Sequence, residues 1–259
     1  MSALLELEAV TICFGGLTAV SEVSMEVGPT DLAGLIGPNG AGKTTLFNLV
    51  TGVYQPTEGA IRVGGRPTAG CKPYELTARG VARTFQNIRL FRSLSVLDNV
   101  RAAMQVHRGE GVLNSLVRGG RFLKAERAVE GQAMELLGLF GLESLREELA
   151  TSLSYGDQRR LEIVRALATR PRLLLLDEPA AGMNPTEKLG LARLIRRIRD
   201  DFQIAVLLVE HDMQLVMDLC ERIHVLDHGI KIAEGTPGEV RRNPRVIEAY
   251  LGEEHALPG

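Results

Sequence analysis

Residues 37 to 45 read GPNGAGKTT, a glycine-rich run that ends in a lysine and two threonines. The glycines at 37 and 42 leave the backbone free to wrap around an anion, and Lys43 followed by Thr44 completes the spacing G-x-x-x-x-G-K-S/T. In such loops, backbone N–H groups surround phosphate oxygens, the lysine neutralises the outer phosphates and the hydroxyl binds Mg²⁺. The run therefore predicts a site for nucleotide phosphates. The predicted contacts are Asn39, Gly40, Ala41, Gly42, Lys43, Thr44 and Thr45.

A second chemical signal is an acidic pair, Asp177 and Glu178, which follows four leucines in LLLLDEP. The apolar run predicts a buried strand, and ligands of α/β sheets gather at the carboxyl ends of such strands. Asp177 can hold Mg²⁺ through water, which leaves Glu178 placed to polarise an attacking water. Two acids after a strand are more often a solvated turn, but the phosphate loop upstream favours the functional interpretation.

The elements that must position these residues follow from hydrophobic periodicity. Residues 4–10, 20–27 and 31–37 have the pattern of strands, and a helix is predicted from 42 to 50, directly after the phosphate loop. The N-terminus of that helix favours negative charge, because its N–H groups are unpaired and its dipole is positive there. Further on, short buried strands at 172–179 and 204–211 flank a helical segment, which predicts a parallel sheet.

Two additions to this core are predicted. Residues 94–170 lose strand character and show helical apolar spacing, which indicates an inserted helical subdomain. After a closing hairpin that turns at residues 227–229, residues 236–259 form a C-terminal tail of two short helices, broken before Pro244. We expect residues 1–259 to form one domain that includes both additions.

Composition narrows the class of protein. The 259 residues are 45% hydrophobic and 24% charged, and the net charge of −2 implies no whole-chain attraction to nucleic acid or anionic lipid. Three widely spaced cysteines without a C-x-x-C arrangement argue against a disulfide framework or a zinc site and favour a reduced, cytoplasmic compartment. The N-terminus lacks the basic start of a signal peptide, and the apolar runs are too short to span a bilayer. We therefore expect any membrane role to depend on a partner.

The segment SLSYGDQRRLEIVRALA, residues 152–168, lies between the phosphate loop and the acidic pair. Periodicity alone predicts only a capped helix there. Its Ser-x-Gly start resembles the signature of ABC transporter ATPases, and further matches follow in order along essentially the whole chain. Gln86 resembles the Q-loop glutamine, His211 the switch histidine, AAGMNP at 180–185 the D-loop, and Phe14 the aromatic residue that faces adenine. Taken singly, such residues are more often a core ring, a surface side chain or a helix cap.

The resemblance implies a fold and a reaction. The fold is an α/β P-loop NTPase of ABC ATPase type, with a mostly parallel sheet core, an N-terminal antiparallel β subdomain and an inserted α-helical subdomain. The reaction is hydrolysis of ATP, with Mg²⁺, to ADP and phosphate, coupled to transport across a membrane. Two such subunits meet head to tail, so that Ser154 and Gly156 bind the γ-phosphate of the ATP held by the partner subunit.

The resemblance also implies catalytic roles. Glu178 acts as the base or orients the water, His211 holds the γ-phosphate and its developing charge, and Gln86 senses Mg²⁺ and the water. The implied Mg²⁺ ligands are Thr44, Gln86 and Asp177.

Four residues depart from the family pattern. Tyr155 replaces the second glycine of the signature and Asp157 follows the glycine at 156, while Met183 and Asn184 replace the common Leu-Asp of the D-loop. The tyrosine adds bulk near the implied dimer interface. The serine and glycine on either side of it keep the two phosphate contacts, so we expect hydrolysis to be retained with an altered rate or dimer affinity.

The amino-acid sequences of several segments resemble one branch of the family, the ATPase subunits of bacterial branched-chain amino-acid uptake systems (leucine, isoleucine and valine). These segments are RTFQNIRLFRSLSVLDNV, LSYGDQRRLEIVRAL, LDEPAAGMNPTE, VEHDMQLVM and NPRVIEAYLGEE. Residues 106–128 correspond to the insertion that marks the member with the longer helical subdomain. The implied partners are integral membrane permease subunits, a second ATPase subunit in a homodimer or heterodimer and, indirectly, a solute-binding protein. The implied location is the cytoplasmic face of the cell membrane.

Three alternatives remain from the sequence. Related ATPases serve uptake of urea and short amides, or lipopolysaccharide export. A soluble ABC ATPase that acts on DNA or ribosomes usually has two cassettes or a long coiled-coil insertion, whereas this sequence shows one cassette and neither addition. A nucleotide-binding regulator without hydrolysis is disfavoured by the intact set of Lys43, Asp177, Glu178 and His211.

Overall fold

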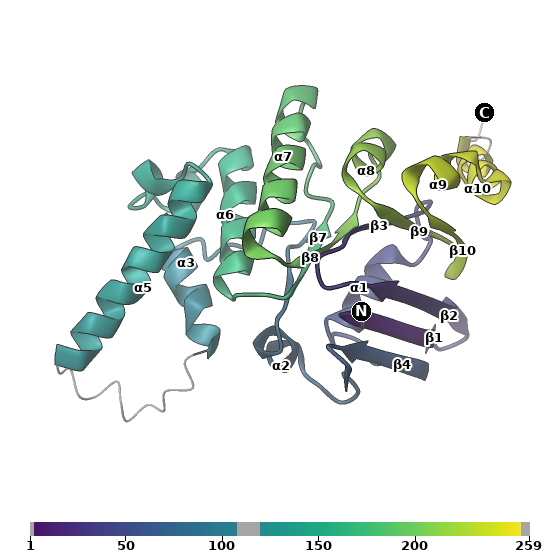
Figure 1. Ribbon diagram of the computed structural model, residues 1–259, viewed down its shortest axis with the longest axis horizontal. Helices are drawn as coiled ribbons and strands as arrows, with labels where there is room; N and C mark the ends of the chain where they lie inside the picture. Colours follow the sequence, from purple (N-terminus) through teal and green to yellow (C-terminus); the bar gives the residue numbers. More distant parts are fainter. Residues whose placement is uncertain (1–2, 108–119, 255–259) are drawn as a thin grey trace. The chain divides into compact units, whose positions relative to one another are not determined.

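The computed structural model describes residues 3–107 and 120–254, which divide into two compact units. One unit combines Met1–Arg83 with Arg172–Gly259 and holds both sheets, and the other is the helical segment Thr84–Pro171 (Figure 1). The helical unit contains the range 94–170, for which the sequence predicts a subdomain. Of the predicted insertion 106–128, residues 108–119 lie outside the described residues. No helix within 3–107 or 120–254 is long and apolar enough to cross a membrane.

A six-stranded sheet forms the centre of the first unit, in the order β10-β9-β3-β8-β7-β6. All neighbouring strands are parallel except β9 and β10, which form the predicted antiparallel hairpin. The strands are β3 (Leu32–Ile36), β6 (Val81–Arg83), β7 (Leu173–Asp177), β8 (Ala205–Val209), β9 (Arg222–Asp227) and β10 (Ile230–Gly235). The sequence did not predict β6, because a three-residue strand is too short to show a period.

The second sheet is antiparallel and has the order β2-β1-β4-β5. Its strands are β1 (Leu5–Phe14), β2 (Leu17–Val27), β4 (Glu58–Val63) and β5 (Arg66–Pro67). The first two were predicted from their alternating pattern. We did not predict β4 and β5, since their sequence is short, contains glycine and proline and is half exposed.

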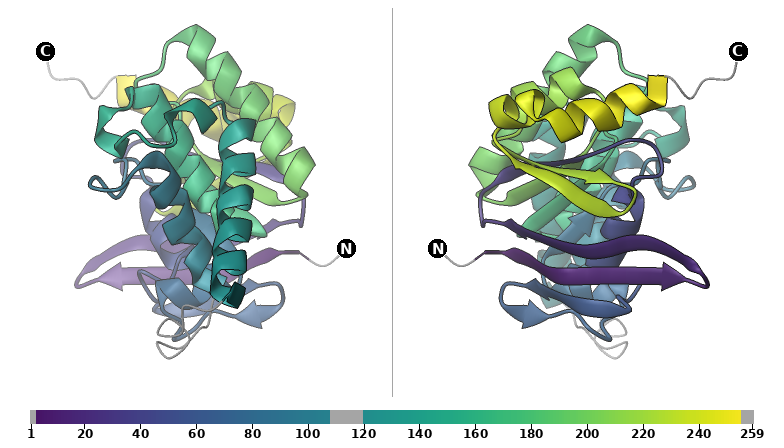
Figure 2. Two further views of the ribbon diagram at one scale, coloured as in Figure 1. Left: turned by 90° about the vertical axis from the view of Figure 1, so that its left-hand side faces the viewer. Right: turned by 90° about the vertical axis from the view of Figure 1, so that its right-hand side faces the viewer.

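Helices cover the parallel sheet and form the C-terminal tail. Figure 1 shows α7 and α8 on one side of the sheet, and Figure 2 shows α9 and α10 beside the hairpin of β9 and β10. The helices of this unit are α1 (Lys43–Val50), α2 (Pro73–Ala78), α7 (Pro185–Phe202), α8 (Met213–Leu219), α9 (Pro237–Arg242) and α10 (Pro244–Glu254). The tail breaks before Pro244, as predicted, because proline is favoured at the first position of a helix and disfavoured inside one.

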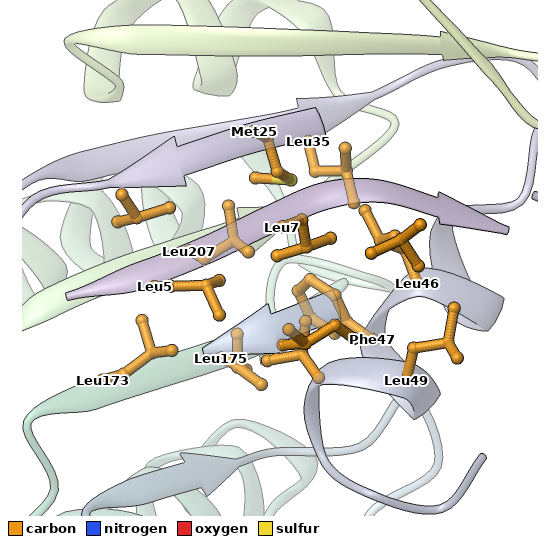
Figure 3. Packing of buried hydrophobic residues seen from close by; sticks show 14 of the residues in the cluster. Leu5, Leu7, Met25, Leu35, Leu46, Phe47, Leu49, Leu173, Leu175 and Leu207 are labelled. Carbon is orange, nitrogen blue, oxygen red and sulfur yellow. The ribbon is translucent and has the colours of Figure 1, made fainter. Parts of the chain in front are cut away.

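A continuous hydrophobic core joins α1 to strands of both sheets (Figure 3). Alternate residues of the parallel strands enter it, including Leu35 of β3, Leu175 of β7 and Leu207 of β8, while β1 contributes Leu5 and Leu7. The intervening residues of these parallel strands are also buried, so both faces of the sheet are covered. A strand that is apolar up to its last residue, as LLLLD is, is therefore required here, and it fixes where the acid at its end must lie.

The described part of the helical unit contains α3 (Val96–Met104), α5 (Gly120–Leu139) and α6 (Tyr155–Ala168), with short 3₁₀ segments at Gln105–His107, Glu143–Leu145 and Ala150–Ser152. The three helices contact one another, as the left view of Figure 2 shows. Buried residues of α5 recur at Val129, Ala133 and Leu137, which is the spacing of one helical face. The unit thus has its own apolar contacts.

His224 of β9 is fully buried, and in the described structure neither ring nitrogen has a hydrogen-bond partner. The nearest carboxylate is Glu234, whose Oε2 lies 3.4 Å from Nδ1. Burial lowers the pKa of His224 to about 4, because the charged imidazolium loses its hydration. The folded protein therefore keeps this side chain neutral at pH values where the unfolded chain takes up a proton.

This difference predicts a loss of stability in acid. The unfolded histidine titrates near pH 6.5, so stability from the neutral folded form is present above that pH and is lost as pH falls towards 4. The expected loss from this group is about 3 kcal/mol. Urea unfolding at pH 7 and pH 4.5 should show a smaller decrease for His224→Leu than for wild type. His228→Asn, which changes an exposed histidine of the same hairpin, should retain the wild-type decrease; equal decreases in all three proteins would contradict the assignment.

Candidate nucleotide-binding site

The phosphate loop connects the buried strand β3 to the helix α1 and depends on its glycines. Gly37 and Gly42 have φ values of 152° and 97°, a region of backbone conformation that glycine adopts without strain. A Cβ atom at Gly37 would lie 2.0 Å from the carbonyl oxygen of Leu226, and one at Gly42 would lie 2.8 Å from that of Ala19. Both glycines are therefore required by neighbouring backbone as well as by the turn.

Lys43 is folded along the inside of this loop. Its ammonium donates hydrogen bonds of 2.7 Å to the carbonyl oxygens of Gly37 and Pro38, and the side chain is buried. Asn39, Gly40 and Thr44 are exposed around it. The remaining predicted contacts are buried Ala41 and half-buried Gly42 and Thr45. The structure therefore brings all seven predicted phosphate contacts together on one loop and one helix start, with the lysine charge at its centre.

Asp177 lies at the end of β7, buried, and is paired with a residue that the sequence did not single out. Arg83, the last residue of β6, donates a 2.7 Å hydrogen bond to Asp177 Oδ2 and another of 2.7 Å to Asn48 Oδ1 of α1. Both charged side chains are less than a tenth exposed. Removal of one member of such a buried pair leaves an uncompensated charge, at a cost of about 3–5 kcal/mol. Arg83 thus ties the acid at the strand end to the helix that follows the phosphate loop.

Glu178 has a left-handed backbone conformation, with φ of 46°. This conformation costs a residue with a Cβ atom about 1–2 kcal/mol, and it persists only where surrounding contacts hold it. The N–H of Glu178 donates to the carbonyl oxygen of Val209 at 2.9 Å, and its own carbonyl accepts from Ala181 N at 3.2 Å. The turn carries its carboxylate out of the strand, where it is about one-fifth exposed.

His211 follows β8 and faces two carboxylates. Its Nδ1 lies 3.7 Å from Glu178 Oε2 and 3.9 Å from Glu210 Oε2, and its side chain is largely exposed. Glu210 is buried, and burial raises the pKa of its carboxyl group, an effect that contacts with backbone N–H groups and with His211 oppose. The predicted switch histidine and the predicted base therefore lie close enough for one water molecule to bridge their side chains.

The D-loop, residues 180–185, connects Glu178 to α7. Asn184 caps α7 by accepting a hydrogen bond from Glu187 N, and the Glu187 side chain accepts from Asn184 N in return, which forms a capping box. Asparagine in place of aspartate therefore still supplies the cap. Beyond the loop, Lys188 donates to Asp212 at 2.5 Å, which lowers the pKa of Asp212.

The signature residues lie in the helical unit, at the start of α6. Ser154 is exposed and caps the helix: its Oγ accepts from Asp157 N at 3.2 Å and donates to Asp157 Oδ2 at 2.7 Å. A Cβ atom at Gly156 would have no neighbour within 4 Å. The glycine is therefore not required by packing within the described chain.

Gln86 belongs to the same unit and lines a groove with Ile88, Leu90, Thr151, Tyr155 and Gln158. The segment that carries Gln86 is held by Arg159 of α6, which donates to the carbonyl oxygens of Phe85 and Gln86. The hydroxyl of Tyr155 accepts from Arg159 in turn. The tyrosine at position 155 thus contacts the arginine that holds the segment around Gln86, while the tyrosine itself is about half exposed.

Phe14, at the end of β1, is 44% exposed and makes an edge-on contact with Tyr54, with ring centroids 5.1 Å apart. Phe14 is therefore not a core residue, and its contact with adenine stays a prediction. The exposed part of the ring is available for contact with a planar ligand.

The oxygen donors of the first unit fit Mg²⁺. Among residues 3–107 and 120–254 there is no cluster of three His, Cys, Asp or Glu side chains suited to a metal. Mg²⁺ bound with nucleotide needs only one or two protein oxygens, because phosphates and water supply the rest. Thr44 offers a hydroxyl on α1 and Asp177 a carboxylate at the end of β7.

Sequence reasoning did not identify Arg83, Arg159 and Glu210 as parts of the site. Glu210 had a detectable signal, because it ends an apolar run in IAVLLVEH as Asp177 does in LLLLDEP. Arg83 and Arg159 had none, since their importance arises from partners 94 and 73 positions away in the chain.

A model of the ABC transporter family matches residues 20–181, and a model of the branched-chain amino acid ATP-binding cassette transporters matches residues 231–256. The chain is 45% identical to BraF, a high-affinity branched-chain amino acid transport ATP-binding protein of Pseudomonas aeruginosa, over 96% of this chain and 98% of that one. It is 36% identical to LptB, the lipopolysaccharide export system ATP-binding protein of Escherichia coli, over 94% of this chain and 95% of that one.

A solved structure of an ATP-binding cassette of an ABC transporter, in its ADP conformation, superposes with a TM-score of 0.82 at 32% identity. The match covers 97% of this chain and 100% of the other. The predicted fold class is confirmed by this likeness and by the two sheets described above. The chain belongs to the ABC transporter family, as an ATP-binding, ATP-hydrolysing cassette.

Proposed function

We propose that the chain is the ATP-hydrolysing motor subunit of a membrane importer for the branched-chain amino acids leucine, isoleucine and valine. The observation that carries this proposal is the 45% identity to BraF over nearly the full length of both chains. The match of residues 231–256 to the branched-chain transporter model supports it. Export of lipopolysaccharide is the less favoured function, because the similarity to LptB is lower.

The chemistry proposed for the first unit uses residues at the ends of three parallel strands. Backbone N–H groups of residues 39–45 and Lys43 bind the phosphates, and Phe14 stacks on adenine. Glu178 orients and deprotonates the attacking water, and His211 stabilises the charge that develops on the γ-phosphate. The 3.7 Å separation of His211 Nδ1 and Glu178 Oε2 supports this division of roles.

Mg²⁺ is proposed to bind together with ATP, held by Thr44 and Asp177. When bound, the ion would supply positive charge that offsets the charge of the phosphates. Arg83 occupies Oδ2 of Asp177 and so orients this carboxylate. Gln86 is proposed as a further Mg²⁺ ligand only because the family resemblance implies it.

The signature is proposed to act on a second subunit. Ser154 and Gly156 lie at the first turn of α6, where N–H groups and the helix dipole favour a phosphate. Glycine in a helix is unfavourable by about 1 kcal/mol relative to alanine. Because nothing within the described chain approaches Gly156, close approach by the nucleotide of a partner ATPase supplies the reason for a glycine here.

The membrane partners are proposed to be permease subunits, with a solute-binding protein acting through them. The groove beside Gln86 and Tyr155 is the proposed seat of a permease segment on the cytoplasmic face of the membrane. No nucleic-acid partner is proposed, in keeping with the net charge of −2.

Glu178→Gln should separate ATP binding from hydrolysis. The amide keeps the size of the side chain but cannot take a proton, so we expect turnover to fall by about 10²–10⁴-fold with little change in ATP affinity. Size-exclusion chromatography with ATP and Mg²⁺ should show a persistent dimer. Turnover close to that of wild type would remove Glu178 from the role of base.

Lys43→Ala should weaken nucleotide binding itself. The substitution removes the ammonium at the centre of the loop, and a lost charged hydrogen bond of about 1.5–3 kcal/mol corresponds to roughly 10–150-fold in affinity. Calorimetry with ATP measures the effect, and the control is Lys231→Ala, which changes a partly exposed lysine on β10 that pairs with Glu234. Unchanged affinity in Lys43→Ala would contradict the role of the loop.

Transport can be tested in cells that lack the chromosomal copy of this chain. Wild-type protein should restore uptake of radiolabelled leucine, isoleucine and valine, whereas Glu178→Gln at equal abundance should not. Restored uptake of urea alone would change the proposed substrate, and no effect on any solute would count against an importer.

A further inference from the structure

The left-handed backbone of Glu178 must be held from both sides, because a residue with a Cβ atom leaves this conformation when its surroundings permit. On one side, the N–H of Glu178 is bound to the carbonyl oxygen of Val209 at 2.9 Å. On the other, the N–H of Ala180 is bound at 2.7 Å to a side chain, the Oε1 atom of Glu210. Val209 and Glu210, two consecutive residues at the end of β8, therefore accept hydrogen bonds from the backbone at Glu178 and at Ala180.

Glu210 is suited to this task by its burial. The residue is 1% exposed, and Ala180 is also buried, so the bond between them is shielded from water. The second carboxylate oxygen of Glu210 accepts from the N–H of His211 at 3.2 Å. The Glu210 side chain thus accepts hydrogen bonds from the backbone N–H of Ala180, beside Glu178, and from that of His211.

We propose that Glu210 is a positioning residue for ATP hydrolysis: it holds Glu178 in the left-handed conformation and fixes the distance between the Glu178 carboxylate and His211. The proposal rests on the proposed roles of these two residues. Glu210 itself touches neither water nor nucleotide in this assignment. Its loss should therefore reduce the rate of the chemical step while the phosphate loop continues to bind ATP.

The opposing interpretation is that Glu210 only satisfies buried N–H groups and stabilises the fold. Two variants separate these interpretations. Glu210→Gln retains an oxygen that can accept from Ala180 N–H, whereas Glu210→Leu has similar bulk and no acceptor. Asp201→Asn is the matched control, because it alters an exposed acid whose partner, Arg197, lies on the same helix α7.

The experiment measures steady-state kcat and KM for ATP together with hydrogen exchange of the amide of Ala180. For Glu210→Leu we expect kcat to fall between about tenfold and a hundredfold, as misplacement of a catalytic group by about 1 Å produces. KM should change by less than about threefold, and Ala180 should exchange at least about tenfold faster, as expected for an amide that has lost its partner. Glu210→Gln should restore most of kcat and most of the protection, and Asp201→Asn should match wild type.

Several results would overturn the proposal. Wild-type kcat in Glu210→Leu would do so, as would a loss of kcat in both Glu210 variants without faster exchange at Ala180. If Glu210→Leu does not fold, failure of folded Glu210→Gln to protect Ala180 would contradict the assignment. Turnover in Glu178→Gln would instead show that Glu178 is not the base. In that case hydrogen exchange of the Ala180 amide would still show whether Glu210 holds this amide.

Discussion

The arrangement of the site residues in the first unit depends on the register of three parallel strands. In this register Leu35 of β3 and Asp177 of β7 both pair with Val209 of β8, so the three strands end at one level. The phosphate loop begins directly after β3, Asp177 is the last residue of β7, and Glu210 and His211 follow β8. Parallel strands buried on both faces cannot slip without exposing apolar side chains. The packing of leucines and valines in the sheet is therefore what gathers polar residues that are far apart in the chain.

The sequence predicted those parts of the fold whose pattern is local and strong. The phosphate loop, the strands that precede it and the acidic pair, and the closing hairpin all have short-range signals in composition or period. The antiparallel strands β4 and β5 and the edge strand β6 lacked such signals, because they are short and depend on pairing with distant strands. The family and fold predictions are confirmed, while the roles assigned to individual site residues remain predictions.

The site residues that the sequence missed share a physical cause. Arg83, Arg159 and Glu210 have buried ionisable side chains, and each binds a partner that is distant in the chain, so their importance exists only after folding. A buried charge without a partner is costly, which makes each of these residues dependent on its counterpart. The strained turn at Glu178 is missed for the same reason, since its cost is met by contacts with β8. In this protein, the candidate site contains residues whose conformation and burial depend on long-range contacts more than on local sequence preference.

The proposed function requires that this cassette works as part of a membrane transporter. Copurification from native membranes tests it most directly, with tagged Glu178→Gln protein in the presence of ATP and Mg²⁺ and mass spectrometry of the recovered proteins. We predict recovery of integral membrane subunits together with an ATPase subunit, either a second copy of this chain or a related one. Recovery of only soluble or ribosomal proteins would contradict the transport function and leave the ATPase chemistry in place.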